Sequence, residues 1–508
     1  MEFVIHPWIN QNAIEKRDYQ DNIVKVAVTG NTLCVLPTGL GKTNIAALVA
    51  ADRLMKFPDN KILFMAPTKP LVEQHKKTFE KFLKLGLELR IATGKDNPEE
   101  RAKLYKDGNI IFATPQTIRN DIKRGIIDLK SFSLLIVDEC HRAIGNYAYP
   151  AVAKSFIYNS KSPLILGLTA SPGSFRQKID EVKKRLFIEH VEIRMRDDED
   201  VRPFVQELEQ EWVEVKLSEK MGEMKKILEN LKNERIKKLM NWKILFAPIA
   251  TKSRLIELQQ SLARKKTGMS WAAMSVIAEI MKIDHALILI ETQSLYSLKN
   301  YLENLREQKT KAVARLFNNE DFNKVISIAD ELISNGDEHP KLQKLREIIE
   351  ESLEDNKYAS IIVFVQYRDT ITKILEILKG IKFASPIEFI GQTKKAGKGL
   401  SQKEQVQILN EFRMGFYNIL IASQIGEEGL DIEETDTVVF YEPIPSAIRK
   451  IQRTGRTART KPGKVITLIT KGTRDEAYHW SGYQKEKKMK KILYGMKNEN
   501  EQKDLTSF

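Results

Sequence analysis

The chain has 508 residues, of which 42% are hydrophobic and 30% are charged, and its 82 Lys+Arg against 68 Asp+Glu give a formal net charge of +14. This length predicts about three domains, and the basic balance favours a polyanionic partner over a merely solvated basic surface. Two cysteines exclude a disulfide framework, and no apolar run approaches the roughly 20 residues that cross a membrane, so we expect a cytoplasmic protein without a membrane partner.

Residues 20–195 alternate short apolar runs with helical patterns. The runs read NTLCVLP, KILFMAP, NIIFATP, SLLIVDE and PLILGLTAS. Runs that are apolar throughout are typical of parallel strands buried on both faces, so this region predicts a parallel α/β sheet. The same rhythm returns at residues 350–480 with ASIIVFVQ, PIEFIG, NILIAS, DTVVFYE and KVITLIT, which predicts a second sheet of the same kind.

The middle of the chain has a different pattern. No proline occurs between Pro248 and Pro340, and leucines recur at helical spacing from Leu295 to Leu305. We therefore predict an α/β protein in which a helical domain is inserted between two parallel-sheet domains. The predicted parts are a first sheet domain at 1–200, the insert at 201–345, a second sheet domain at 346–490 and a C-terminal tail at 491–508.

The insert contains an unusually basic segment, residues 231–270. Ten Lys/Arg against two Glu give it a charge of +8, over half of the net charge of the chain. A solvated face is the alternative, but the concentration of charge favours contact with nucleic acid. The side chains expected to make that contact are Lys237, Lys238, Arg264, Lys265 and Lys266.

The stretch CVLPTGLGKT, residues 34–43, follows a predicted strand and opens a helical pattern. In that context a glycine-rich loop can hold phosphate: its backbone N–H groups point inward, its lysine reaches the β and γ phosphates, and its threonine hydroxyl binds Mg²⁺. Leu36 stands where the usual pattern has its first glycine. The residues expected to contact nucleotide are Pro37, Thr38, Gly39, Leu40, Gly41, Lys42 and Thr43.

The stretch SLLIVDECH, residues 133–141, places two carboxylates at the end of another predicted strand. Ligands of open α/β sheets bind outside the carboxyl ends of strands, so Asp138 and Glu139 should face the same crevice as Lys42. Asp138 can hold Mg²⁺ through water, and Glu139 can position and deprotonate the attacking water. Zinc or thiol chemistry is disfavoured because no further Cys or His stands at ligand spacing, and we expect Cys140 in a small, half-buried slot.

These motifs resemble superfamily two helicases over nearly the whole chain. PTGLGKT resembles motif I, DECH motif II, TAS motif III, VFVQYR motif IV, ASQIGEEGLDI motif V and QRTGRTAR motif VI. The resemblance implies two RecA-like domains that close on ATP and Mg²⁺. It adds as nucleotide contacts Arg17, Gln20, Gly429 and Asp431. As contacts to one nucleic-acid strand it adds Thr68, Lys69, Thr93, Gly94, Thr114, Pro115, Gln366 and Ser423. Residues expected to couple the two sites are His141, Thr169, Ser171 and Gln452.

Motif VI carries Arg453, Arg456 and Arg459 at helical spacing, which predicts three cations on one helix face. Such cations repel one another, so we expect an anion to face them. The resemblance makes Arg456 and Arg459 arginine fingers, which stabilise charge on the departing γ-phosphoryl group. Ala458 stands where the family usually has glycine.

A closer resemblance is to the archaeal Hef helicase region and to the Fanconi anaemia M-group and Mph1-type translocases. It rests on the helical insert, on residues 399–432 and on PSAIRKIQRTGRTAR. It implies an ATP-dependent 3′ to 5′ helicase on branched or forked DNA in replication-fork processing and repair, monomeric and nucleoid-associated, with a nuclease domain missing from this chain. RNA-sensor and Dicer helicases share the insert and DECH, so a motor on double-stranded RNA is an alternative. A nucleic-acid clamp that does not hydrolyse ATP is another.

Overall fold

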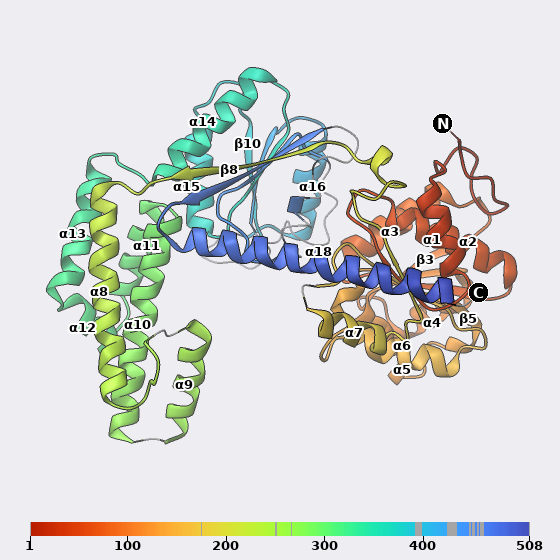
Figure 1. Ribbon diagram of the computed structural model, residues 1–508, viewed down its shortest axis with the longest axis horizontal. Helices are drawn as coiled ribbons and strands as arrows, with labels where there is room; N and C mark the ends of the chain where they lie inside the picture. Colours follow the sequence, from red (N-terminus) through yellow and green to blue (C-terminus); the bar gives the residue numbers. More distant parts are fainter. Residues whose placement is uncertain are drawn as a thin grey trace.

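The computed structural model describes residues 2–173, 175–248, 251–265, 267–391, 399–423, 434–446, 449, 453, 454, 457 and 462–506, with side chains placed up to Lys497. Within these residues the chain forms two parallel sheets and a helical bundle. The second sheet lies between the bundle and the first sheet, and one long helix runs from the second sheet onto the first domain (Figure 1). The predicted α/β architecture is confirmed.

The first sheet has the strand order β3-β4-β2-β5-β6-β1-β7, with all neighbours parallel. Its strands are β1 (Thr32–Val35), β2 (Lys61–Met65), β3 (Leu89–Ala92), β4 (Ile110–Ala113), β5 (Phe132–Val137), β6 (Ile165–Thr169) and β7 (His190–Ile193). One face is covered by α1 (Asp18–Ala27), α2 (Lys42–Lys56) and α3 (Lys69–Phe82). The other face is covered by α4 (Pro98–Asp107), α5 (Pro115–Lys123), α6 (Ala148–Asn159) and α7 (Arg176–Arg185). Burial on both faces explains why the central strands are apolar throughout.

The second sheet has the order β10-β11-β9-β12-β13-β8, again with parallel neighbours. Its strands are β8 (Leu208–Val215), β9 (Ile361–Phe364), β10 (Pro386–Phe389), β11 (Ile419–Ala422), β12 (Thr437–Phe440) and β13 (Gly463–Thr470). On one face lie α14 (Pro340–Asp355) and α15 (Arg368–Leu378), and on the other lies α16 (Gln402–Arg413).

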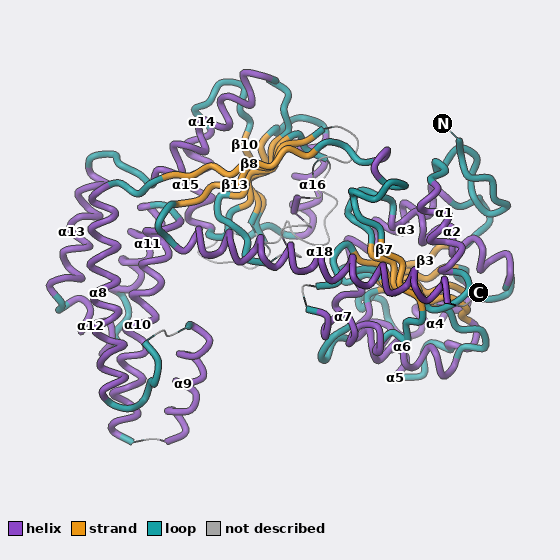
Figure 2. The backbone as a smooth tube through the Cα atoms, in the orientation of Figure 1, coloured by secondary structure: helices purple, strands orange, loops and turns teal. Residues whose placement is uncertain are grey.

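The insert is an all-helical bundle beside the second sheet (Figure 2). Its helices are α8 (Glu219–Asn241), α9 (Lys252–Lys265), α10 (Gly268–Thr292), α11 (Leu295–Arg306), α12 (Lys311–Phe317) and α13 (Glu320–Ser334). Most of them begin after a Ser, Thr or Asn whose side-chain oxygen accepts a hydrogen bond from the backbone N–H three residues later. Each such cap stabilises a helix by about 1 kcal/mol.

Every apolar run named in the sequence forms a strand, whereas β3, β7 and β8 were not predicted. These three lie at sheet edges and carry exposed polar side chains, so they lack the continuous apolar pattern of a buried strand. The structure also differs from the predicted boundaries. Residues 208–215, assigned to the insert, belong to the second sheet because β8 pairs with β13 along its full length.

The last helix, α18 (Arg474–Thr506), continues across the boundary predicted at residue 490. Its first turn lies against the second sheet and the bundle, and Arg474 forms ion pairs with Asp284 and Glu291 of α10. Further along, Met489 and Leu493 are buried in the core of the first domain. One helix therefore packs against all three parts of the molecule. None of the described helices is long and apolar enough to cross a membrane.

A buried ion pair joins α14 to the first turn of α18. Lys341 and Asp475 are both fully buried, and the ammonium group contacts the carboxylate directly. Lys341 Nζ also lies 5.3 Å from the centroid of the Tyr441 ring, and the Thr470 backbone N–H donates to Asp475 at 3.0 Å. Burial raises the pKa of the neighbouring Glu442 carboxyl to about 8, against the opposing pull of Lys341. This junction holds the second sheet to the helix that reaches the first domain.

Candidate ATP site and nucleic-acid interface

The candidate site lies where the strands of the first sheet end. Ala92 pairs with Ala113, Ala113 with Met65, and Met65 with Val137, so these four strands end in register. The loops that follow parallel strands lie side by side at one edge of the sheet. That edge carries, in spatial order, residues 93–94, 114–115, 66–68 and 138–139, and then the ends of β6 and β1.

The phosphate loop follows β1 and leads into α2. Gly39 and Gly41 have φ values of 85° and 81°, in the left-handed region that favours glycine. A Cβ on Gly41 would lie 2.4 Å from Nε2 of Gln20, so a side chain at this position would displace that amide. Lys42 begins α2, and its ammonium group donates to the backbone oxygen of Leu36 at 2.9 Å. The backbone N–H groups at the start of a helix such as α2 are suited to phosphate oxygens.

Leu36 explains the departure from the usual glycine pattern. The residue is fully buried and extends β1 by one step, since its backbone N–H donates to Thr169 O at 3.0 Å. Its side chain belongs to the core under α2. Leucine at this position is therefore compatible with the left-handed backbone of Gly39 and Gly41.

Gln20 has a buried acceptor that fits a nucleotide base. The side chain is 1% exposed, and Nε2 donates to Leu40 O at 3.1 Å. Its Oε1 has no hydrogen-bond partner within the described part of the chain. A buried amide oxygen without a donor is costly, and the amino group of adenine would supply one. Arg17 lies nearby with its guanidinium carbon 4.9 Å from the centroid of the Phe204 ring, which fixes the plane of that side chain.

Asp138 is held by a histidine that the sequence analysis passed over. Its Oδ2 lies 2.9 Å from Nε2 of His75, a buried residue of α3. Tyr149 OH donates to the backbone oxygen of Asp138 at 2.6 Å. Burial alone would raise the pKa of Asp138, but His75, Lys42 and the neighbouring backbone N–H together hold it below its usual value. The carboxylate is therefore ionised, as a ligand of a divalent cation must be.

The residues present thus fit Mg²⁺ bound with nucleotide. Thr43 stands in the first turn of α2 directly after Lys42, and Asp138 ends the strand two places away in the sheet. The hydroxyl and carboxylate oxygens are hard ligands of the kind that Mg²⁺ prefers. We assign Thr43 and Asp138 to this role as a proposal.

Replacing His75 by Ala is expected to weaken the apparent affinity for Mg²⁺ by about 10–100-fold, the usual cost of losing an outer-shell partner of a metal ligand. The measurement is the ATPase rate as a function of Mg²⁺ at saturating ATP. His6→Ala provides the control, because His6 lies near the N-terminus and bonds to Trp8. Equal Mg²⁺ dependence in wild type and His75→Ala would show that the contact has no role in metal binding.

Glu139 has an unusual backbone and a close contact with the next motif. Its φ of 47° lies in the left-handed region, a strained conformation for a residue with a side chain. His141 Nδ1 lies 3.2 Å from Glu139 Oε2 and 3.1 Å from Thr169 Oγ1. Ser171 continues the series: its N–H donates to Thr169 Oγ1, and its hydroxyl donates to the sulfur of Met489 in α18 at 2.9 Å. The predicted coupling residues 141, 169 and 171 are therefore in contact.

Cys140 is fully buried, so the expectation of a half-buried slot was wrong. Its sulfur lies 3.3 Å from where a Cβ of Gly167 would stand, which leaves room for a thiol only because residue 167 is glycine. Burial raises the pKa of the thiol well above its ordinary value. A protonated, inaccessible thiol has no nucleophilic role.

Substituting Cys140 by Ala should keep the ATPase kcat within about threefold, since the thiol touches no predicted nucleotide contact. Removing the buried sulfur should lower the free energy of unfolding by about 1 kcal/mol. Steady-state ATPase assays and urea unfolding of the variant measure the two effects. A loss of activity of 100-fold or more with an intact fold would assign the thiol a chemical role.

The strand-contacting residues predicted in the first domain gather at helix starts. Thr68 and Thr114 are the N-caps of α3 and α5, and within the described part of the chain neither side chain makes a capping hydrogen bond. The Thr114 hydroxyl lies 3.0 Å from Thr117 Oγ1. Thr93 instead bonds through its N–H and hydroxyl to Asp96, at 2.8 and 2.9 Å. Helix N-termini are suited to phosphate groups of a nucleic-acid backbone. Lys69 and Pro115 are the first residues of α3 and α5, and Gly94 follows Thr93 in its loop.

In the second domain the described residue Ser423 follows β11 directly, and Gln366 stands two residues after the end of β9. Phe364 pairs with Ala422, so the two loops lie at one edge of that sheet. Six predicted residues lie outside the described part of the chain: Lys266, Gly429, Asp431, Gln452, Arg456 and Arg459. Their roles remain predictions from the motifs.

Arg453 is buried in the second domain, whereas its spacing predicted that it faces an anion together with Arg456 and Arg459, which lie outside the described part of the chain. The residue is 6% exposed, and its guanidinium carbon lies 4.9 Å from the centroid of the Phe364 ring. Burial lowers its pKa to about 10. The contact with the Phe364 ring accounts for the burial of Arg453. The spacing of residues along a helix does not predict such a contact.

The basic segment of the insert is only partly available for a ligand. Lys232 pairs with Asp284, Arg235 with Glu279 at 2.8 Å, and Arg254 with Glu257 at 3.2 Å. Four of the predicted contacts lie on the exposed surface of α8 and α9: Lys237, Lys238, Arg264 and Lys265. Lys238 Nζ also lies 5.1 Å from the centroid of the Trp242 ring. The usable positive surface is therefore smaller than the +8 charge suggests.

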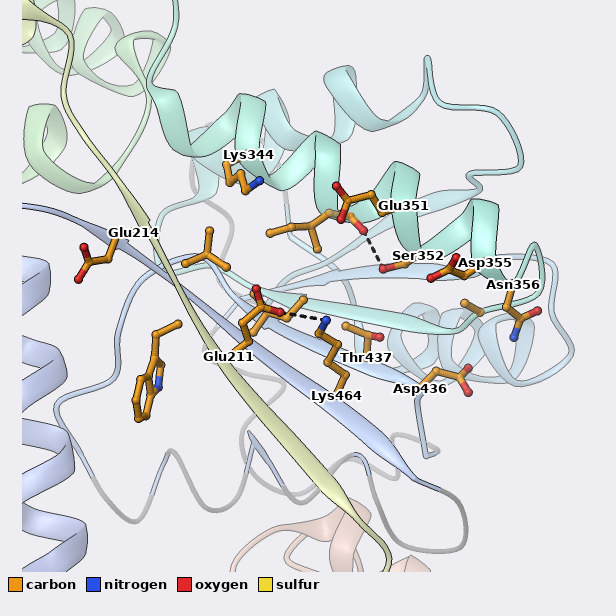
Figure 3. Close-up of a pocket in the computed structure, with 15 residues that line it drawn as sticks. Glu211, Glu214, Lys344, Glu351, Ser352, Asp355, Asn356, Asp436, Thr437 and Lys464 are labelled. Carbon is orange, nitrogen blue, oxygen red and sulfur yellow. Dashed lines mark hydrogen bonds and ion pairs between the residues drawn. The ribbon is translucent and has the colours of Figure 1, made fainter.

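A cavity of about 590 Å³ lies between the two sheet domains and α18. Thr38 of the phosphate loop and Ala170 line it from the first domain, Thr454 from the second, and Met489 from α18. Closure of this space would bring motif VI toward the phosphate loop. A separate cavity of about 580 Å³ lies between α14 and β8, where Glu211 pairs with Lys464 (Figure 3). It contains none of the predicted site residues.

Known protein families match each part of the chain. The DEAD/DEAH box helicase family matches residues 17–179, and the helicase conserved C-terminal domain matches residues 340–461. Between them, the helical bundle of a putative ATP-dependent RNA helicase matches residues 220–333. The matches follow the two sheets and the bundle.

The crystal structure of the Pyrococcus furiosus Hef helicase domain is similar to this one, with a TM-score of 0.74 and 42% sequence identity, and the match covers 93% of this chain and 99% of that chain. A putative ATP-dependent RNA helicase of Methanocaldococcus jannaschii is 42% identical over 97% of this chain. The ATP-dependent DNA helicase fml1 of Schizosaccharomyces pombe is 33% identical over 93% of this chain. The chain spans 63% and 59% of the lengths of these two relatives.

The fold and the site together define a two-domain helicase of the DEAD/DEAH-box class, which uses ATP. More closely, the chain belongs to the family of the Hef helicase, whose helicase domain it matches nearly from end to end. The resemblance drawn from the motifs is confirmed.

Proposed function

We propose that this protein is an ATP-dependent helicase or translocase that acts on branched or forked DNA with 3′ to 5′ polarity. The observation that carries the proposal is the row of loops in which Asp138 and Glu139 lie beside the loops that lead into α3 at Thr68 and into α5 at Thr114. Nucleotide turnover in one part of that row can alter the hold on a strand in the next. A role in fork processing and repair in the nucleoid fits this activity.

Each nucleotide residue has a defined task in the proposed mechanism. Lys42 and the N–H groups of its loop bind phosphate oxygens, and Glu139 accepts the proton of the attacking water. Asp138 stays ionised and orients the hydrated cation, which neutralises phosphate charge when bound. Arg456 and Arg459 complete the site from the second domain, by their match to motif VI.

Coupling to the strand is proposed to pass through His141. This side chain contacts both Glu139 and Thr169, at 3.2 and 3.1 Å. A change in the charge or position of Glu139 would therefore reach Thr169, and through Ser171 the helix α18. Opening and closing of the two sheets would then shift Thr68 and Thr114 relative to Gln366 and Ser423.

Selection of substrate must rest on shape, because contacts from helix starts to phosphates carry no base sequence. The fission yeast relative named as a DNA helicase supports DNA as the substrate. The Methanocaldococcus relative named as a putative RNA helicase supports the alternative of double-stranded RNA. Strand displacement tests the proposal: a forked duplex should be unwound only with ATP and a 3′ tail. Equal displacement without a fork or tail would contradict it.

The insert is proposed to hold the duplex arms of the fork. Reversing Lys237 and Lys238 to Glu should weaken fork binding about tenfold or more near 0.1 M salt, because each lost phosphate contact removes counterion release. Lys309→Glu with Lys311→Glu is the matched control, since both are exposed residues of the same bundle that belong to neither α8 nor α9. Fluorescence anisotropy with a labelled fork measures the affinity. If both double variants lose the same affinity for the fork, the loss is due to the change in net charge and not to a contact made by Lys237 and Lys238.

A further inference from the structure

An exposed aromatic cluster lies where β8 meets α18. Trp212, Trp480 and Tyr483 are 50%, 59% and 38% exposed. Their rings are linked through His479, with centroid distances of 5.1 Å from Trp212 to His479, 5.5 Å from His479 to Trp480 and 6.0 Å from Trp480 to Tyr483. Single exposed aromatic residues are common, but a contiguous cluster on two elements marks a binding surface.

Lysines continue the aromatic surface along α18. Lys487 follows Tyr483 by four residues, which places it one turn further on the same helix face, and Lys488 is also exposed. Lys488 Nζ lies 4.9 Å from the centroid of Phe175, a 46% exposed ring in the first domain. The surface thus runs from the second sheet to the first domain along the helix that joins them (Figure 1). We name its members the α18 stripe: Trp212, Trp480, Tyr483, Lys487, Lys488 and Phe175.

Two acids near the stripe, Glu214 and Glu486, are paired or half-buried. Glu214, on the same face of β8 as Trp212, is paired with Lys471 at 3.0 Å. Glu486 lies half-buried in the cavity between the domains, whereas Lys487 and Lys488 are exposed. The stripe therefore offers flat apolar rings followed by ammonium groups.

We propose that the α18 stripe binds single-stranded DNA. Unpaired bases stack on exposed aromatic faces while lysines contact the phosphates, and this combination needs no base sequence. Duplex DNA has its bases already stacked on one another and would leave the rings without a partner. The inference rests on the proposed function, since an unpaired strand is what separation of a fork yields.

The test measures binding of a labelled oligothymidine of about 16 nucleotides, the upper end of common site sizes, by fluorescence anisotropy. Trp480→Ala with Tyr483→Ala should raise the Kd at least about fivefold. Tyr158→Ala with Tyr358→Ala is the matched control, because those rings are 72% and 78% exposed elsewhere, and its Kd should stay within about twofold. An unchanged Kd in the stripe variant, or an equal loss in the control, would overturn the proposal.

Salt dependence supplies a second readout that does not depend on the rings. Lys487→Gln with Lys488→Gln should reduce the slope of log Kd against log salt by about 1.4, or about 0.7 for each phosphate contact to a single strand. An unchanged slope would show that Lys487 and Lys488 do not contact the phosphates of the bound strand. If oligouridine alone loses affinity in these variants, the assignment to DNA is wrong.

The outcome separates this inference from the proposed function. Fork-stimulated ATPase activity together with unchanged oligothymidine binding in the variants would overturn the stripe and leave the helicase proposal standing. A second result would be that the variants lose oligothymidine binding while forked DNA does not stimulate the ATPase activity of the wild type. This result would support DNA binding by the α18 stripe and contradict the proposed function.

Discussion

Glu139→Gln is expected to lower the ATPase kcat by about 10²–10⁴-fold, the usual contribution of a general base. The substitution keeps the size of the side chain and its approach to His141 but removes the proton acceptor. Affinity for nucleotide should change by less than about threefold, because the phosphates are held by Lys42 and the loop before it. Steady-state ATPase assays with saturating DNA and direct binding of a fluorescent nucleotide measure the two effects.

Glu99→Gln, on an exposed turn of α4, is the control for charge and should keep the wild-type rate. Two results would count against the assignment of Glu139. If Glu139→Gln hydrolyses ATP as fast as an active wild type, another group is the base. If both proteins are equally slow with DNA present, the chain is a nucleotide-dependent clamp rather than a motor.

Lys341→Met is expected to lower the free energy of unfolding of the second domain by about 3–5 kcal/mol. The reason is that Asp475 would be left as a buried carboxylate without its cation. Replacing both partners, by Lys341→Met with Asp475→Asn, should recover much of the loss because no charge then remains buried. Urea unfolding followed by fluorescence measures the change in each variant.

Lys344→Met provides a control one turn along the same helix. Lys344 pairs with Glu347 at 3.0 Å on the surface, where such a pair contributes less than about 1 kcal/mol. The account predicts a large difference between the two lysines. A cost below about 1 kcal/mol for Lys341→Met would mean that water or another group compensates Asp475.

The parts of the fold that the sequence predicted are those that a buried pattern specifies. Strands such as β5 and β11 are covered on both faces, so nearly every residue is apolar and the pattern is unambiguous. Strand β8 reads LEQEWVEV and lies at an edge, where most side chains face solvent. Pairing with β13 alone makes it a strand, and a pairing partner more than 200 residues away leaves no local signal.

The residues of the candidate site also differ in how far the sequence could predict them. Lys42, Asp138 and Glu139 were predictable because their chemistry requires those residue types at the ends of strands. His75 was not, because it meets Asp138 through the packing of α3 on the sheet, 63 residues away in sequence. Arg453 was expected to face an anion, but its side chain is buried with its guanidinium carbon 4.9 Å from the centroid of the Phe364 ring, and helical spacing does not reveal burial.

The ATPase rate in the presence of different nucleic acids distinguishes forked DNA from the other candidate substrates. The measurement compares stimulation of kcat by a forked DNA, a linear DNA duplex of the same length and a double-stranded RNA. We predict that the fork gives the strongest stimulation and that the RNA gives little. Stimulation by double-stranded RNA alone, with the DNA fork inert, would contradict it.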